Sequence, residues 1–282
     1  MFELIYRYDP AHPRVRRAPA CADEACRCLV EGNRLFSSVA TDGTAGSVVV
    51  PIDLEDIGLA APGGTLKQQP FAVVLGCSDA RVPTELIFDR SCNELFVVRV
   101  AGNVLGQEQL GSIDYAIEHF GSDLKVLVVL GHSQCGAVTA AVDAFLTPTE
   151  YLGLASSHHI RAIVNALFPA VRGASRSLSV AWGETVMERA GYRAALIETS
   201  VVINAALMAS ILNAEFGDTS QDRRILFGVY DLASRRVHVP ASAKAVPEPV
   251  IHLLEAPKGP EEFRELARLV VSSGFIQRLL ER

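Results

Sequence analysis

Four short apolar segments, separated by helical patterns, constrain the fold more than any other feature of the sequence. They are rich in Val, Leu and Ile and read FAVVLG (71–76), ELFVVRV (94–100), KVLVVLG (125–131) and RILFGVYDL (224–232). Such runs are typical of strands buried on both faces of a parallel sheet, with helices as the crossover connections. RRVHVP, which follows the last run after a tight turn, is expected to add an antiparallel strand. The sequence therefore predicts an α/β fold with four parallel strands and one antiparallel strand, flanked by helices.

The chain is expected to have three regions. Residues 20–39 have helical spacing and lead into a Gly/Thr/Ser-rich connection, so residues 1–50 are predicted to form an N-terminal helical arm and linker. The main α/β domain is expected over 51–240. Residues 241–282 are predicted to form a Pro-rich connection followed by one amphipathic helix.

Composition excludes several classes of function. The net charge is -6, and we expect no nucleic-acid partner because nucleic-acid surfaces are normally basic. No run reaches the roughly 18 apolar residues of a membrane span, so none is predicted. At the N-terminus apolar residues precede the charges, the reverse of a secretory signal, and six irregularly spaced cysteines do not suggest a disulfide framework. We therefore expect a cytoplasmic protein with reduced thiols.

Two of the predicted strands end in similar sequences that carry metal-ligand side chains. VVLGCSDAR contains Cys77 and Asp79, and VVLGHSQCG contains His132 and Cys135. Sites in parallel sheets form where strands end at their carboxyl edge, so we expect these four side chains to converge. Two thiolates, an imidazole and a carboxylate suit tetrahedral Zn²⁺. The sequence predicts one zinc ion per chain.

The other cysteines are interpreted as structural. Cys26 and Cys28 are two residues apart on a predicted helix and do not share a face, whereas Cys21 and Cys92 are isolated. A zinc redox switch would need a resolving thiol next to a ligand cysteine in the sequence, and none is present.

The motifs CSDAR and GHSQCGA resemble those of the β-class carbonic anhydrases, whose zinc signature is C-x-D-x-R with H-x-x-C. PTELIFD, ELFVVRVAGN and VYDL are also similar to family segments, and the resemblance spans roughly residues 20–240. It implies a zinc lyase that reversibly hydrates CO2 to bicarbonate and a proton. It also implies a homodimer, or an oligomer of dimers, whose N-terminal helices embrace the partner.

The resemblance assigns roles to the matching positions. Cys77, His132 and Cys135 match permanent zinc ligands, and Asp79 and Arg81 match a catalytic dyad. Bound to zinc, Asp79 would complete a closed site; released from it, Asp79 would leave a position for water. Arg81 can hold the carboxylate away, because guanidinium pairs bidentately with carboxylate. We therefore expect zinc-bound hydroxide, oriented by Asp79, to attack CO2.

Further positions match the family's substrate pocket. Gln68 matches a glutamine that hydrogen-bonds the bound substrate, often across the dimer interface. Tyr115 could equally be a core residue, and Val74 replaces the tryptophan of an inhibitory bicarbonate site, so that site is not expected here even though Arg99 is present. The apolar pocket positions are Phe96, Tyr115 and Ala101.

Two other functions remain open from the sequence. The same fold and zinc site could hydrolyse COS or CS2, because pocket shape decides between these substrates. Alternatively, the chain could be a non-catalytic zinc scaffold, although such a site would not need Asp79, Arg81 or Gln68. His119, His158 and His159 are candidates for proton transfer by residue type alone.

Overall fold

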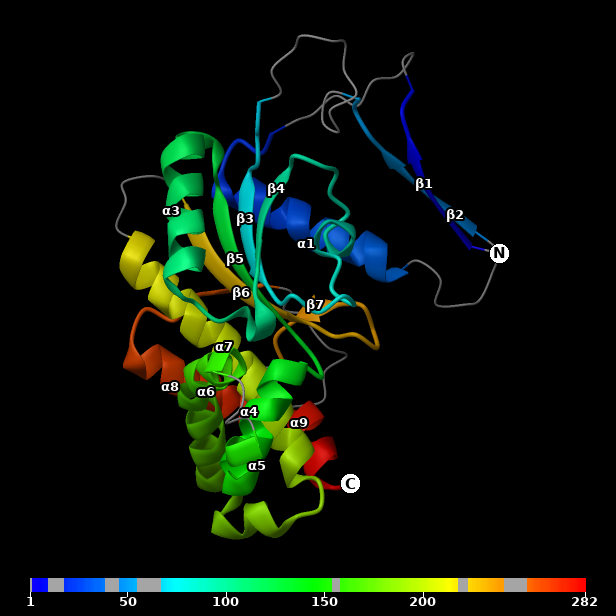
Figure 1. Cartoon of the computed structure of the whole chain (residues 1–282). Coiled ribbons are helices and arrows are strands. Elements are labelled where there is room, and N and C mark those ends of the chain that lie inside the picture. Colours follow the sequence, from blue (N-terminus) through cyan, green and yellow to red (C-terminus); the bar gives the residue numbers. More distant parts are fainter. Residues whose placement is uncertain are drawn as a thin grey trace.

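The computed structural model describes residues 2–9, 18–38, 46–54, 67–153, 158–217, 223–240 and 253–282. Its main sheet has the strand order β4–β3–β5–β6–β7, and β8 also pairs with β6 (Figure 1). The pairings from β4 to β6 are parallel, whereas β7 and β8 run antiparallel to β6. This confirms the predicted fold and adds β8. The strands are β3 (Ala72–Gly76), β4 (Leu95–Arg99), β5 (Val126–His132), β6 (Arg224–Tyr230), β7 (Val237–His238) and β8 (Leu254–Glu255).

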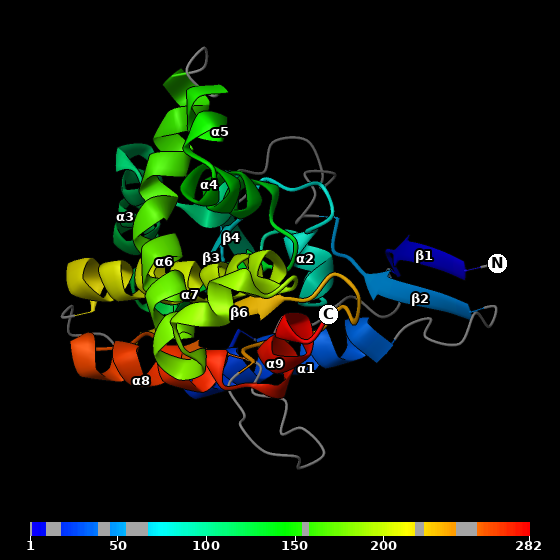
Figure 2. The ribbon, with the colours of Figure 1, turned by 90° about the horizontal axis from the view of Figure 1, so that it is seen from below.

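Side chains of the sheet alternate between two hydrophobic cores, as the period of a strand requires. In β3, Ala72 and Val74 belong to one core, and Val73 and Leu75 belong to the other. Figure 2 shows α1 on the opposite side of the sheet from α4 and α6. The helices are α1 (Ala22–Ser38), α2 (Thr84–Ile87), α3 (Gln107–Phe120), α4 (Gly136–Leu146), α5 (Pro148–Gly153), α6 (His158–Trp182), α7 (Tyr192–Phe216), α8 (Pro260–Val271) and α9 (Gly274–Leu280).

The helix α7 is the central helix of the larger core. It is the one helix in the described part of the chain that is long and apolar enough to cross a membrane, and 78% of its most apolar window is buried inside the protein. It packs against β5, β6 and α6. This burial is typical of a core helix, which passes the same test of length and composition.

The N-terminal region contains the predicted helix and also an unpredicted ribbon. The helix α1 is held by the buried Asn33, whose Nδ2 donates to the carbonyls of Ile87 and Arg235, both at 3.1 Å. The backbone N–H of Val237 donates to Asn33 Oδ1 at 2.8 Å. The prediction of a purely helical arm was incomplete, because β1 (Phe2–Arg7) and β2 (Gly46–Pro51) form a parallel two-stranded sheet. Parallel strands must come from distant segments, which a local pattern does not reveal.

The C-terminal region has two helices where the sequence pattern predicted one. The helical conformation is interrupted between α8 and α9. Ser273 caps α9, because its Oγ accepts a hydrogen bond from the backbone N–H of Ile276 at 3.4 Å. Both helices contribute side chains to the larger core. The predicted Pro-rich connection lies largely outside the described residues. Between α4 and α7, the described residues form α5 (Pro148–Gly153) and α6 (His158–Trp182).

Candidate metal centre

The two ligand-bearing sequences meet because their strands are neighbours. The strands β3 and β5 are parallel, and Gly76 at the end of β3 is opposite Leu130 in β5. Cys77 follows β3 directly, His132 is the last residue of β5, and Cys135 immediately precedes α4. The carboxyl ends of both strands therefore deliver their side chains to the same edge of the sheet, as the sequence predicted.

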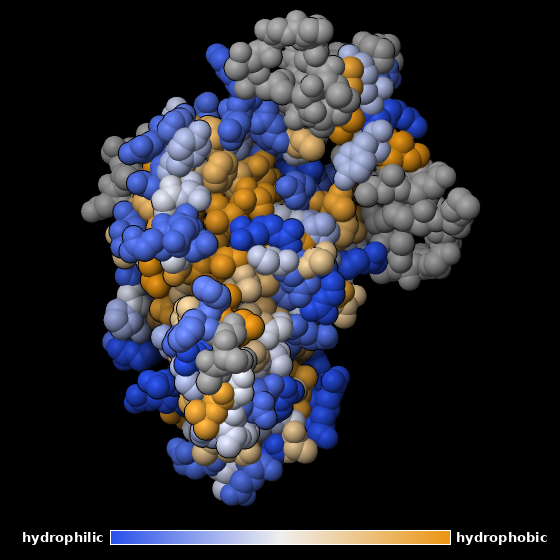
Figure 3. Space-filling model, in the orientation of Figure 1, coloured by the Kyte–Doolittle hydropathy of each residue, from blue (hydrophilic) through white to orange (hydrophobic). Residues whose placement is uncertain are grey.

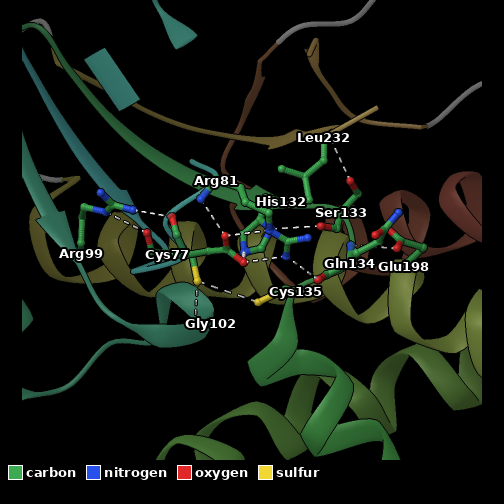
Figure 4. Close-up of polar contacts among 11 residues, drawn as sticks. Cys77, Arg81, Arg99, Gly102, His132, Ser133, Gln134, Cys135, Glu198 and Leu232 are labelled. Carbon is green, nitrogen blue, oxygen red and sulfur yellow. Dashed lines mark hydrogen bonds and ion pairs between the residues drawn. The ribbon is translucent and has the colours of Figure 1, made fainter. Parts of the chain in front are cut away.

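Cys77, His132 and Cys135 form a compact buried group (Figure 4). Their ligand atoms all lie within 4.8 Å of one another, and the residues are 4%, 0% and 1% exposed. The two Sγ atoms are 4.0 Å apart. Two sulfur ligands of one tetrahedral zinc ion lie about 3.8 Å apart when each Zn–S bond is about 2.3 Å. The spacing thus fits a shared metal ion, and both thiols are free rather than joined in a disulfide.

The histidine is oriented for ligation. His132 Nδ1 lies 3.0 Å from the carbonyl oxygen of Ser133, a contact that places the ring proton on Nδ1. The other ring nitrogen, Nε2, is buried and has no hydrogen-bond partner among the described residues. Buried polar atoms are nearly always paired, so an imidazole nitrogen left free beside two thiols fits a metal ligand.

The charges of the two thiols also favour a cation. A hydrogen bond from Cys135 lowers the pKa of the Cys77 thiol, so one thiolate forms readily. The same pairing, together with burial, raises the pKa of Cys135. Two thiolates this close repel each other unless a positive ion lies between them. Zinc therefore fits the residues present, through the Cys77, His132 and Cys135 side chains.

Asp79 and Arg81 form an ion pair beside this group. Arg81 Nε donates to Asp79 Oδ1 at 3.0 Å, and Nη2 donates to Oδ2 at 2.7 Å. The backbone N–H of Arg81 donates to Oδ1 at 2.9 Å. These hydrogen bonds hold the pKa of Asp79 well below its usual value. Asp79 Oδ2 lies 3.8 Å from His132 Nε2, so the carboxylate borders the ligand group while it is paired with Arg81.

Arg99 and Gly102 support the Cys77 side of the centre. Arg99 Nε donates to the carbonyl of Cys77 at 2.9 Å, and its Nη2 donates to the carbonyl of Asp79 at 2.6 Å. The backbone N–H of Gly102, in the short helical turn Ala101–Asn103, donates to Cys77 Sγ at 3.3 Å. These hydrogen bonds from Arg99 and Gly102 were not predicted from the sequence. Arg99 could have been noticed, because it lies near the end of the next predicted strand after the one that leads to Cys77.

Ser133 supports the His132 side. Its Oγ donates to Asp231 Oδ1 at 3.2 Å and accepts from the backbone N–H of Leu232 at 2.9 Å. The segment VYDL, which contains Asp231, therefore anchors the residue that follows the histidine. Outer contacts of this kind fix the orientation of metal ligands.

The predicted pocket positions are only partly brought to the centre. Ala101 precedes Gly102 and lies next to it. Phe96 is opposite Val73, four residues or about 13 Å before Cys77 along the strand direction. Its ring lies 6.3 Å from that of Tyr115, which is 43% exposed. Gln68 is exposed and precedes β3, at the opposite end of that strand from Cys77. The substrate roles of these residues stay predictions.

The fold and the site together define an α/β protein with a buried Cys–His–Cys group, able to hold a metal ion, at the carboxyl edge of a parallel sheet. Residues 72–235 match the sequence profile of a family described as "Carbonic anhydrase". The matched region contains all three ligand residues and the Asp79–Arg81 pair. The chain belongs to the β-class carbonic anhydrase family.

Curated relatives agree with this membership. The chain is 39% identical over 149 residues to carbonic anhydrase 2 of Mycobacterium tuberculosis, which covers 52% of this chain and 63% of that protein. It is 43% identical over 109 residues to a carbonic anhydrase of Mycolicibacterium smegmatis, covering 38% and 48% respectively. The match to each of these two relatives thus spans less than two thirds of the relative's length.

Solved structures with a similar architecture include two β-carbonic anhydrases. CafA of Aspergillus fumigatus is similar with a TM-score of 0.46 at 19% identity, covering 87% of this chain and 91% of that one. CcaA is similar with a TM-score of 0.48 at 18% identity, covering 81% and 95%.

Proposed function

We propose that this protein reversibly hydrates CO2 to bicarbonate and a proton, with a zinc ion held by Cys77, His132 and Cys135. The observation that carries the proposal is the buried Cys–His–Cys group with the Asp79–Arg81 ion pair on its border. A purely structural zinc site needs four ligands and no such pair. The membership of the chain in the β-class family points to the same reaction.

Bound zinc supplies Lewis-acid activation of water at this centre. The task of Asp79 is to accept a hydrogen bond from the attacking water through Oδ2, the oxygen that faces His132 Nε2. Its low pKa keeps it ionised and able to accept. Arg81 fixes both carboxylate oxygens, so Asp79 stays paired and does not become a further zinc ligand. A C–O bond forms as water adds to CO2, and one proton leaves to solvent.

Stopped-flow CO2 hydration by protein of measured zinc content tests this proposal. Wild-type protein should be active, and Asp79→Asn should retain zinc but lose most of the activity. Zinc-loaded protein that is inactive with CO2 but hydrolyses COS or CS2 would favour the alternative hydrolase. Zinc-loaded protein that is inactive with all three substrates would indicate a scaffold.

A homodimer is part of the proposal. Figure 3 shows apolar residues gathered on the face where α3 lies beside β4. The strand β4 is an edge of the main sheet, and its Phe96 and Val98 are only partly buried. Exposed apolar edges are typical of interfaces. Light scattering on purified protein should show at least a dimer.

A cytoplasmic location is proposed from the sequence features alone, and localisation of a tagged chain tests it.

A further inference from the structure

The turn between His132 and Cys135 has an unusual backbone and a side-chain partner from α7. Gln134 has a φ of +55°, in the left-handed region that non-glycine residues seldom occupy. Its backbone N–H donates to Glu198 Oε1 at 3.0 Å. Glu198 belongs to α7, 64 residues further along the chain. A carboxylate from the central core helix thus holds the strained residue between two metal ligands (Figure 4).

The same turn is connected to the ion pair. The carbonyl oxygen of Gln134 accepts a hydrogen bond from Arg81 Nη2 at 3.4 Å. Nη2 is also the atom that binds Asp79 Oδ2. A movement of Gln134 would therefore disturb both the neighbouring ligand Cys135 and the guanidinium that orients Asp79.

A second contact from α7 reaches the other half of the centre. Asn204 Nδ2 donates to the carbonyl of Gly102 at 2.8 Å, and the N–H of Gly102 donates to Cys77 Sγ. Asn204 is 1% exposed, and its Oδ1 has no partner among the described residues. An amide with one unsatisfied buried oxygen lowers stability, so the hydrogen bond to Gly102 is the evident reason for an amide at this position.

We propose that α7 sets the spacing between the two halves of the metal centre, with Glu198 and Asn204 as positioning residues. Glu198 places the turn that carries His132 and Cys135, and Asn204 places the turn that donates to Cys77. The two residues are six positions apart, or about 9 Å along the helix axis. A buried helix keeps such a separation better than a loop, so α7 fixes the distance between the two supporting turns, while the pairing of β3 with β5 brings the strand ends together.

This inference deepens the proposed function and rests on it for the activity measurement only. Two further measurements concern the metal alone: zinc affinity by chelator competition, and the absorption spectrum of protein loaded with Co²⁺ in place of zinc. Cobalt absorption reports the geometry and thiolate donation of the ligand set whether or not CO2 is hydrated. If the wild type proved inactive with CO2, the role of α7 would still be tested.

The first comparison uses Glu198→Ala, Glu198→Gln and, as a control, Glu215→Ala at an exposed position of α7. Glu198→Ala should lower the zinc affinity or kcat by about 10- to 100-fold and shift the absorption bands of the Co²⁺-loaded protein. Glu198→Gln should restore the wild-type values, because its amide oxygen accepts the same hydrogen bond. Glu215→Ala should change nothing. A Glu198→Ala protein with unchanged affinity, spectrum and kcat would overturn the proposal.

Asn204→Leu tests the Cys77 side independently and serves if Glu198→Ala does not fold. Leucine has a similar volume and removes the unpaired oxygen, so the fold should persist. We expect a shift of the thiolate-to-cobalt absorption, because the turn that donates to Cys77 Sγ loses its support. An unchanged spectrum in this variant would contradict the role given to Asn204.

Discussion

Replacing Arg81 by alanine should abolish most of the CO2 hydration while leaving zinc in place. The structure gives Asp79 three hydrogen bonds from Arg81, two from the side chain and one from the backbone N–H. Arg81→Ala keeps the backbone bond to Oδ1 and removes both side-chain bonds, so Oδ2 loses its partner. The carboxylate is then free to pivot about Oδ1, and Oδ2, which lies 3.8 Å from His132 Nε2, can move towards the three ligand side chains.

The loss of one preorganised hydrogen-bond donor at a reacting centre reduces kcat by about 10²- to 10³-fold, and we expect a loss in this range. The assay is stopped-flow CO2 hydration at equal zinc content. Arg81→Lys is the matched control, because it retains the charge but not the bidentate geometry. Its kcat should lie between that of the wild type and that of Arg81→Ala. Arg81→Ala with near-normal turnover and full zinc would refute the assignment of Arg81 to Asp79.

Three further predictions follow from particular contacts. Asn33→Ala should lower the free energy of unfolding by about 3 kcal/mol, because it leaves three hydrogen bonds unmade, two of them buried and one partly buried; a loss below about 1 kcal/mol in urea denaturation would contradict this. Zinc at about 100 times its dissociation constant should stabilise the wild type by about 3 kcal/mol but should leave His132→Ala unchanged, as measured by thermal unfolding. Burial raises the pKa of the Glu198 carboxyl above its ordinary 4.5, so the folded protein binds this proton more tightly than the unfolded chain does. The stability of the wild type relative to Glu198→Gln should therefore fall as the pH rises from below 4.5 through the higher folded pKa, and a difference that is constant with pH in urea titrations would exclude this.

Much of the fold followed from local patterns. The four apolar runs became the four parallel strands, because a strand buried on both faces must be apolar throughout. The elements that were missed depend on distant partners. The strand β1 is stabilised by β2, and the short β8 by β6, so neither carries a strong pattern of its own. The C-terminal helix was split by a capping serine that helical periodicity does not register.

The sequence by itself determined the chemistry of the centre. Cys77, His132 and Cys135 lie at the carboxyl ends of two strands that read almost alike, and the carboxyl ends of parallel neighbours necessarily meet. Only the tertiary structure decided how that centre is held. Arg99, Glu198 and Asn204 reach it from β4 and α7, far away in the chain, through hydrogen bonds to backbone groups. Almost any sequence presents such backbone groups, so the identity of their partners depends on packing and not on a motif.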